Sequence, residues 1–296
     1  MRVIALAERA LEELVPEPPG AAELEGSLAF RWQAAGGRGR LIAISDPAHF
    51  DLDDLIGVDE SVAALDRNTR QLLAGLPCND VLLHGERGTG KSSAVRGLLG
   101  RYAARGLRLV EVDRSDLVHL PDVLEALRAG AHLHFLVFCD DLSFAQGEPG
   151  FRELKAALQG GLVRRPVNTC IVATSNRRHL VPESMAENRQ ARIDEHGELH
   201  LGEALEEKLA LADRFGLVLG FYGFDQATYL AAVERYLAKA GVPRLDAELR
   251  EEALRFALRR GSRSGRAARQ FVDDAVGRIR LAETGAKRPA TGPLLR

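Results

Sequence analysis

The chain has 296 residues, which is long enough for two domains of the common size of about 100–150 residues. The hydrophobic fraction of 46%, the charged fraction of 28% and the net charge of −2 are ordinary for a soluble globular protein, so no overall charge attracts nucleic acid or a membrane. Three scattered cysteines argue against a disulfide framework and a zinc cluster. Because we find no export signal and no apolar membrane span, we expect a cytoplasmic location.

Residues 1–48 are predicted to be an N-terminal accessory segment. Residues 1–14 have the apolar spacing of a helix, and the proline-rich run at residues 16–20 ends it. A second break at residues 36–39, which are rich in glycine, precedes an apolar run at residues 41–44.

Residues 49–224 are predicted to form an α/β domain, because apolar runs of strand length alternate with helical patterns. Such alternation is typical of a parallel sheet covered by helices on both faces. Strands are expected at residues 81–83, 109–112, 135–138, 171–173 and 218–221. The segment from Glu183 to Glu207 is dense in Glu and Arg, and we interpret it as a loop insertion that offers a partner surface.

The pattern changes after residue 225 to helix upon helix. Helices are expected at residues 226–240, 246–260 and 264–284, separated by segments that contain glycine. Residues 225–284 are therefore predicted to be a smaller all-helical domain, and residues 285–296 a flexible tail.

The strand expected at residues 81–83 leads into a phosphate-binding motif. Gly85 to Ser92 match G-x-x-x-x-G-K-[ST], in which glycines let backbone N–H groups surround an anion at the start of a helix. Lys91 is expected to reach the outer phosphates of a nucleoside triphosphate, and Ser92 to ligate Mg²⁺. The predicted nucleotide-binding residues here are Gly85, Glu86, Arg87, Gly88, Thr89, Gly90, Lys91, Ser92 and Ser93. A chance glycine turn is the alternative, which the flanking strand and helix disfavour.

Two further strands end in polar side chains. The strand at residues 135–138 runs into Asp140, the predicted magnesium ligand, and Asp141, the candidate base that orients water. The strand at residues 171–173 runs into Thr174 and Asn176, either of which is placed to hydrogen-bond the γ-phosphate or the attacking water. Aspartate, serine and asparagine also cap helices and turns, so a purely structural role remains the alternative.

Two arginines complete the predicted site. Arg214 lies just before the last expected strand, and Arg266 begins the last expected helix. A guanidinium stabilises the charge that accumulates on a transferring γ-phosphoryl group. Each arginine alone is weak support, because most arginines on helices are simply solvated.

These elements, in this order over residues 50–284, resemble the AAA+ ATPases. The resemblance implies that Ile56 and Gly57, in the segment Asp-Asp-Leu-Ile-Gly-Val, line an adenine pocket, and that residues 85–92 and 135–141 are Walker A and Walker B. It also implies that Asn176 is sensor 1, that Arg214 is an arginine finger acting on a neighbouring subunit, and that Arg266 is sensor 2 in a helical lid. The implied fold class is a P-loop NTPase parallel sheet flanked by helices, with a smaller C-terminal all-helical lid domain.

The strings at residues 139–144, 173–180 and 212–217 resemble more narrowly a bacterial branch of ATP-binding proteins, domain-of-unknown-function family 815. The resemblance does not extend over the first 40 or so residues or the tail. One departure matters for catalysis, because Walker B ends in Asp140-Asp141 where most active members of the superfamily have Asp-Glu. The shorter side chain is expected to slow hydrolysis without affecting binding.

Other nucleotide-binding classes fit less well. No Asn-Lys pair occurs for a GTPase guanine reader, and no Leu-Ser-Gly-Gly-Gln string occurs for a transporter subunit. A small-molecule kinase would not explain Asp-Arg-Phe followed by a helical lid. Nucleic acid is a less favoured partner, for which only the arginines in one short stretch argue. These are Arg259, Arg260, Arg263, Arg266 and Arg269.

The function predicted from the sequence is that of a cytoplasmic AAA+ protein that binds ATP and Mg²⁺. We expect a homo-oligomer that hydrolyses ATP to ADP and phosphate at a subunit interface and thereby remodels or loads a macromolecular client. The alternative is a nucleotide-dependent switch or scaffold with little intrinsic hydrolysis, which the short Asp141 favours.

Overall fold

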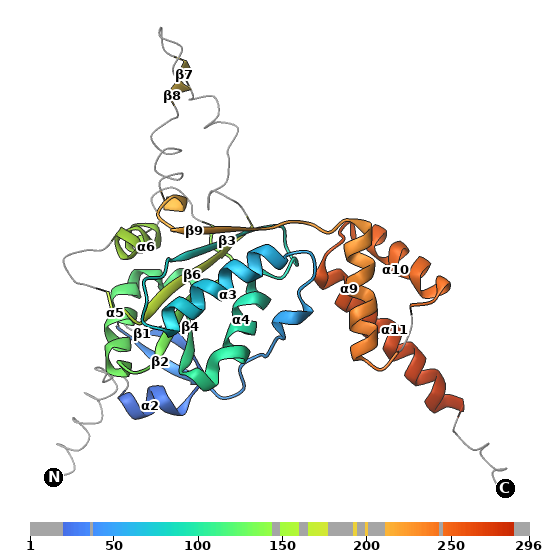
Figure 1. Ribbon diagram of the computed structural model, residues 1–296, viewed down its shortest axis with the longest axis horizontal. Helices are drawn as coiled ribbons and strands as arrows, with labels where there is room; N and C mark the ends of the chain where they lie inside the picture. The colour runs from blue at the N-terminus through green and yellow to red at the C-terminus, as the bar shows by residue number, and fades with distance from the viewer. Residues whose placement is uncertain are drawn as a thin grey trace, which may run out of the picture. The chain divides into compact units, whose positions relative to one another are not determined.

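The computed structural model describes residues 20–35, 38–143, 149–159, 165–176, 192–193, 199–200, 211–242 and 245–286. The chain divides into two compact units, each drawn in Figure 1. The α/β unit consists of Met1–Leu52, Asp59–Glu86 and Lys91–Phe221, and the helical unit of Asp53–Val58, Arg87–Gly90 and Tyr222–Arg296. The domain bounds predicted from the sequence remain predictions. The expected helix at residues 1–14, residues 177–180 and most of the tail lie outside the described residues.

The α/β unit is built on a seven-stranded sheet with the order β2-β1-β4-β5-β6-β3-β9. Its strands are β1 (Ala29–Ala35), β2 (Arg38–Ile44), β3 (Val81–Gly85), β4 (Leu107–Glu111), β5 (His134–Cys139), β6 (Thr169–Ser175) and β9 (Leu217–Phe221). Neighbouring strands are parallel except for the antiparallel pair of β1 and β2. The strands expected from the sequence are all present, and the predicted parallel sheet is confirmed.

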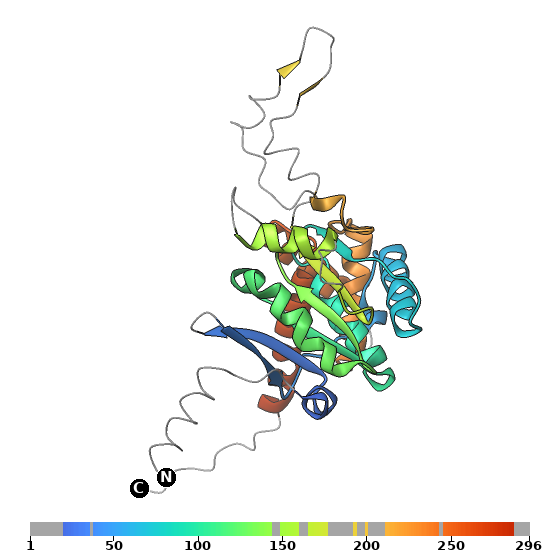
Figure 2. The ribbon, with the colours of Figure 1, turned by 90° about the vertical axis from the view of Figure 1, so that its left-hand side faces the viewer.

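Helices cover both faces of this sheet. Alternate strand residues such as Leu82, Val137 and Ile171 pack with the α5 (Leu120–Ala126) and α6 (Pro149–Gln159) side, while α3 (Asp59–Leu73) and α4 (Lys91–Tyr102) cover the other face. Figure 2 shows the sheet between these two layers. Because side chains of both faces are buried, the central strands are apolar throughout, and each fully buried Leu or Val contributes about 1.5–3 kcal/mol. Short 3₁₀ helices lie at Leu52–Asp54, Ala103–Arg105, Arg114–His119 and Leu127–Gly130.

The N-terminal hairpin is an integral part of the sheet, although its sequence set it apart as an accessory segment. Strand β1 pairs in parallel with β4, with Ala29 opposite Leu109. Trp32 and Leu41 are buried in the same core as the central strands, beside the short helix α2 (Ala21–Gly26). Within residues 183–207 the structure describes only the antiparallel pair β7 (Arg192–Ile193) and β8 (Leu199–His200).

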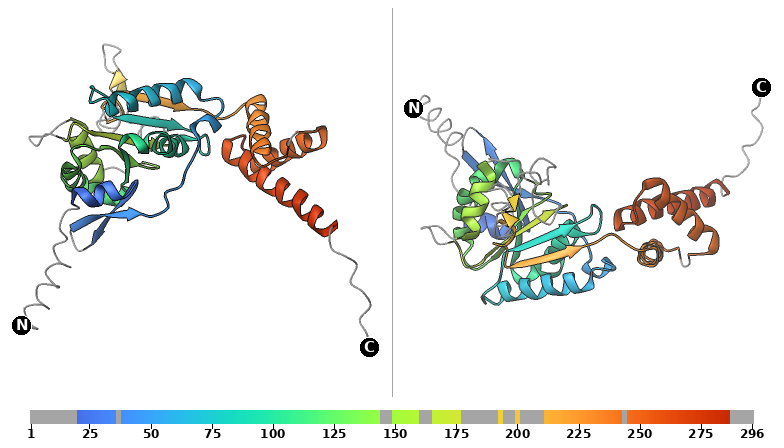
Figure 3. Two further views of the ribbon diagram at one scale, coloured as in Figure 1. Left: turned by 60° about the horizontal axis from the view of Figure 1, so that its bottom comes forward. Right: turned by 90° about the horizontal axis from the view of Figure 1, so that it is seen from above.

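The helical unit contains α9 (Gln226–Lys239), α10 (Ala247–Arg260) and α11 (Gly265–Ala286), which Figure 3 shows in two further views. The Asp225 carboxylate accepts from the Thr228 N–H and begins α9, and Asp246 begins α10 in the same way through Leu249. Gly261, at φ 63°, ends α10 in the left-handed conformation. Tyr229, Val233 and Phe271 lie in the unit's own apolar core.

The predicted fold class is therefore confirmed: a parallel sheet flanked by helices, with a smaller C-terminal helical unit. The three helices of this unit begin and end within two residues of the ranges expected from the sequence. In the part of the chain that the structure describes, none of the helices is both long and apolar enough to cross a membrane.

Candidate functional site

The predicted site residues of the α/β unit follow the carboxyl ends of β3, β5 and β6. These strands are adjacent and parallel, and their register places His84 beside Ser175 and Cys139 beside Ala173. The residues that follow each strand therefore emerge at one edge of the sheet. Asp140, Asp141 and Asn176 are brought together there with the first residues of the P-loop and of helix α4.

The loop between β3 and α4 turns sharply at glycines. Gly85, Gly88 and Gly90 all have positive φ, at 135°, 78° and 108°. A Cβ on Gly85 would stand only 1.8 Å from the carbonyl oxygen of Phe221, whose oxygen accepts a hydrogen bond from the Glu86 N–H at 3.1 Å. The loop thus lies directly against the end of β9, and only glycine fits at its first position.

Lys91 folds back over the loop that precedes it. Its Nζ donates to the carbonyl oxygens of Gly85 at 2.8 Å and Glu86 at 2.6 Å, and to Oδ1 of Asn176 at 3.3 Å. The side chain is buried, so the ammonium is fixed between the loop and the end of β6. A cation held beside a glycine turn at a helix N-terminus is the arrangement that binds phosphate.

A hydroxyl and a carboxylate meet beside the start of α4. The Ser92 Oγ donates to Oδ1 of Asp140 at 2.7 Å, and the Thr174 hydroxyl donates to the same oxygen at 2.5 Å. Among the described residues no cluster of three or more His, Cys, Asp or Glu side chains is able to hold a metal alone. One hydroxyl and one carboxylate fit Mg²⁺ instead, because this ion is usually held by one or two protein oxygens together with substrate phosphates and water.

Asp141 has an unusual backbone. Its φ of 49° is the one positive value among the described residues other than glycine. Its N–H donates to Oγ1 of Thr174 at 2.8 Å, and its carboxylate accepts a hydrogen bond from Nδ2 of Asn176. The candidate base is therefore oriented by Thr174, on strand β6, and by Asn176, which directly follows that strand.

Arg214 precedes the amino end of β9, whereas the P-loop follows the carboxyl end of the neighbouring strand β3. The five residues of β9 run parallel to β3 and end beside Gly85, and five strand residues span about 16 Å. The Gln159 amide, oriented with its oxygen toward the guanidinium, accepts hydrogen bonds from Nη2 at 2.7 Å and Nε at 2.8 Å. The structure does not bring Arg214 to the P-loop of its own chain.

The helical unit contains the other predicted residues. The Arg266 N–H donates to the Gly88 carbonyl at 3.2 Å, and a Cβ on Gly88 would stand 2.9 Å from the Arg266 Cβ. A Cβ on Gly90 would stand 2.5 Å from Cδ2 of Leu55. The start of α11 therefore approaches Gly88 closely, and Leu55, which precedes Ile56, lies beside Gly90. At both loop positions the positive φ favours glycine.

Ile56 and Gly57 belong to a segment that is fixed to helix α9. Ile56 packs against the core of the helical unit, and Gly57, at φ 74°, lies against the Thr228 side chain. The buried Asp54 pairs with Lys239 Nζ at 2.6 Å and Arg235 Nε at 3.3 Å. The role of Ile56 and Gly57 in an adenine pocket stays a prediction.

Thr174 was one of two candidates, with Asn176, for a hydrogen bond to phosphate or water. Its hydroxyl is buried and bonded to Asp140 and to the Asp141 backbone. These contacts arise from the parallel register of β5 and β6, which sets the end of one strand beside the other and which the local sequence does not record.

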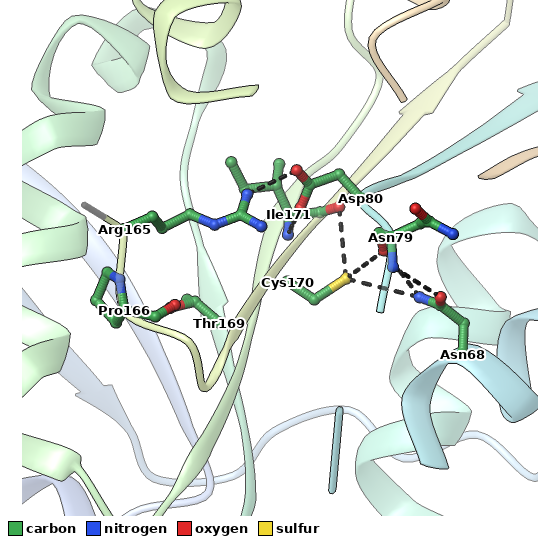
Figure 4. A network of polar contacts seen from close by, with 8 residues as sticks. All are labelled: Asn68, Asn79, Asp80, Arg165, Pro166, Thr169, Cys170 and Ile171. Carbon is green, nitrogen blue, oxygen red and sulfur yellow. Dashed lines mark hydrogen bonds and ion pairs between the residues drawn. The ribbon is translucent and has the colours of Figure 1, made fainter. Parts of the chain in front are cut away.

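A second polar network ties β3 to β6 near their amino ends (Figure 4). The buried Asp80 carboxylate accepts from the Ile171 N–H at 2.8 Å and pairs with Arg165 Nη1 at 2.6 Å. Cys170 Sγ donates to the Asn79 carbonyl, which also accepts from the Asn68 amide. This network lies near the amino ends of the strands, away from the candidate site at their carboxyl ends, so it supports the strands without taking part in the site.

The arginines considered for nucleic acid are exposed around the turn from α10 to α11. Arg260 lies over the Phe256 ring, and Arg269 lies over the Tyr236 ring and near Asp273. Packing on rings and pairing with an acid are ordinary uses of surface arginines, so they do not favour nucleic acid further.

A family model described as "Protein of unknown function (DUF815)" matches residues 25–279. The chain belongs to the DUF815 family. The resemblance predicted from the motifs is confirmed, and it extends further forward than expected, because the DUF815 match takes in the hairpin of β1 and β2. A comparison with curated protein sequences gave no match.

Several solved structures are similar to this DUF815 chain at low sequence identity. The RuvB Holliday junction branch migration motor of Thermotoga maritima is 14% identical, with a TM-score of 0.42 over 75% of this chain and 71% of RuvB. AMPPCP-bound DnaA from Aquifex aeolicus is 16% identical, with a TM-score of 0.49 over 80% of this chain and 65% of DnaA. A DNA replication initiation factor is 17% identical, with a TM-score of 0.47 over 79% of this chain and 64% of that protein.

Proposed function

We propose that this DUF815 protein is an AAA+ ATPase that binds ATP with Mg²⁺. The observation that carries the proposal is the hydrogen bond from Ser92 to Asp140, which joins the first turn of the P-loop helix to the end of β5 at 2.7 Å. With Lys91 fixed beside the same loop, this pairing supplies the cation, the hydroxyl and the carboxylate that a magnesium triphosphate requires.

The residues would divide the binding between them. The loop N–H groups and Lys91 would hold the β- and γ-phosphates, and Ser92 and Asp140 would hold the metal. Magnesium, when bound, neutralises charge on the phosphates. Arg266, whose N–H donates to the Gly88 carbonyl, is proposed to act as sensor 2.

Asp141 and Asn176 are the residues proposed for hydrolysis. The Asp141 carboxylate would orient water and take its proton, while the Asn176 amide, bonded to both Asp141 and Lys91, would hold the water and the γ-phosphate in line. ATP and water then give ADP and phosphate: the oxygen of water bonds to the γ-phosphorus, the bond to the β-phosphate oxygen breaks, and the water proton goes to Asp141.

Arg214 is proposed to act on the ATP of a neighbouring subunit in a homo-oligomer. Its position before the amino end of β9 supports this role, because the length of that strand separates Arg214 from the P-loop of its own chain. The proposed client is a macromolecule. The Asp141→Asn variant would hold ATP without hydrolysing it, so affinity capture with this variant is designed to identify the client.

Calorimetric titration of the full chain with ATP, with and without Mg²⁺, tests the binding proposal. Lys91→Ala is expected to weaken ATP binding at least about 10-fold, since a buried charge-assisted contact is worth about 1.5–3 kcal/mol. Lys155→Ala, on helix α6 of the far face, is the matched control and should bind as the wild type does. Wild-type protein without affinity for ATP would overturn the proposal.

A nucleotide-dependent switch is the second candidate function, and the Asp-Asp ending of Walker B favours it. Such a protein would recruit its partner on binding ATP and hydrolyse it slowly. Steady-state ATPase measurements distinguish the two. Robust turnover that Asp141→Asn abolishes would exclude the switch, whereas tight binding with negligible turnover, even with the captured client, would exclude the remodelling ATPase.

A further inference from the structure

The Thr174 hydroxyl lies between the two aspartates of the site. It donates its proton to Oδ1 of Asp140 at 2.5 Å and accepts the Asp141 N–H at 2.8 Å. Thr174 is 1% exposed. A hydroxyl has a single proton, so one that donates to Asp140 is no longer available as a donor to a phosphate or a water. The Thr174 hydroxyl thus makes both of these hydrogen bonds to other groups of the protein.

The backbone after β5 is clamped to the end of β6 by more than this hydroxyl. The Leu142 N–H donates to the Thr174 carbonyl at 2.7 Å, and the Ser175 hydroxyl donates to the Leu142 carbonyl at 2.7 Å. Between these contacts Asp141 adopts the left-handed conformation, with φ 49°. A residue with a Cβ adopts it at a cost, although Asp does so more readily than most, and it persists where surrounding contacts enforce it.

This turn determines where the second carboxylate points. At this left-handed turn the Asp141 carboxylate meets the side-chain amide of Asn176, which lies two residues after Thr174. The position of the candidate base is thus set by the backbone turn, which the Thr174 hydroxyl holds, and less by the length of the side chain.

We propose that Thr174 is a positioning residue that serves both aspartates. It orients the Asp140 carboxylate toward Ser92 and the metal, and it holds the Asp141 backbone in the turn that presents its short carboxylate beside Asn176. A Walker B that ends in Asp-Asp then has a correctly placed base without the extra methylene of glutamate. This inference rests on the proposed function, since it concerns the same site.

The test compares two substitutions at Thr174 with one at Thr169. Thr174→Val keeps the shape and removes both hydrogen bonds, whereas Thr174→Ser keeps the hydroxyl. Thr169→Val is the matched control, because Thr169 is also 1% exposed on β6 and its hydroxyl bonds to the Pro166 carbonyl at 2.8 Å, near the amino end of the strand (Figure 4). Calorimetry measures ATP affinity as a function of Mg²⁺, and steady-state kinetics measures kcat and KM.

Thr174→Val is expected to weaken the Mg²⁺-dependent part of ATP binding and to lower kcat, each by about 10–100-fold, the usual loss when a residue that orients a metal ligand is changed. Affinity for ATP in the absence of Mg²⁺ should stay within about twofold of wild type, since the P-loop contacts remain. Thr174→Ser should keep most of the Mg²⁺-dependent affinity and of kcat, and Thr169→Val should behave as wild type.

Three outcomes would overturn the inference: unchanged Mg²⁺ dependence and kcat in Thr174→Val, a serine variant as impaired as the valine variant, or an equal loss in Thr169→Val. If Thr174→Val does not fold, Thr174→Ala takes its place with the same readouts. Failure of the proposed function would appear in the wild type itself, as absence of ATP binding, whereas failure of this inference appears only as the lack of a difference between wild type and variants.

Discussion

Asn176 donates a hydrogen bond from its side-chain amide to the carboxylate of Asp141, while its amide oxygen accepts from the ammonium of Lys91. One amide thereby connects the residue proposed to bind phosphate to the residue proposed to activate water. The three side chains come from different segments, α4, the end of β5 and the end of β6, and the parallel sheet brings them to one edge.

Asn176→Ala is expected to lower kcat by about 10²-fold, because the base and the water lose their alignment, while ATP affinity changes little. Pre-steady-state and steady-state ATPase assays measure kcat, and calorimetry measures ATP affinity. Unchanged kcat in the alanine variant contradicts the assigned role.

Gly85→Ala is expected to destabilise the fold by about 3 kcal/mol, since the new Cβ would collide with the Phe221 carbonyl at a φ that side chains rarely adopt. Gly75→Ala is the matched control: φ is also positive, at 65°, but no atom lies within 4 Å, so only the conformational cost of about 1 kcal/mol remains. Urea denaturation followed by circular dichroism measures both. Equal losses would show that the β9 contact is unimportant.

Arg214→Ala should bind ATP as the wild type does and lose turnover by about 10³-fold, the usual effect of removing an arginine finger. Mixing it with Lys91→Ala protein should restore part of the activity, because one protomer then supplies the finger and the other the nucleotide site. Arg67→Ala, an exposed arginine on α3, is the control. Full activity of Arg214→Ala protein in isolation would refute a role in trans.

Asp80→Ala should cost about 2 kcal/mol in the free energy of unfolding, because it leaves the Ile171 N–H and Arg165 without their acceptor. ATP affinity of the folded variant should be unchanged, since Asp80 directly precedes β3, whereas the P-loop follows the other end of that strand. Glu125→Ala removes an exposed pair with Arg128 and is expected to cost less than about 1 kcal/mol. Thermal unfolding with and without nucleotide separates the stability effect from binding.

The elements of this protein follow largely from local patterns. The apolar runs before Gly85, Asp140 and Asn176 predicted three strands of the sheet, and the acid N-caps Asp225 and Asp246 begin the first two helices after the sheet. Strand β1 was not predicted, because only Phe30 and Trp32 are large and apolar in its first half. Its burial depends on pairing with β4, a contact that the local sequence does not contain.

What the sequence alone determined is the chemistry of the site: the glycine loop, Lys91, Ser92, the two aspartates and Asn176 are recognisable from residue type and position after a strand. Only the tertiary structure decided how they are arranged, with the Thr174 hydroxyl between Asp140 and Asp141, the left-handed turn at Asp141, and Arg214 before the amino end of β9. The physical reason is that motifs record neighbours along the chain. Contacts between residues more than 30 positions apart arise from strand order and register, which the packing of the whole sheet determines.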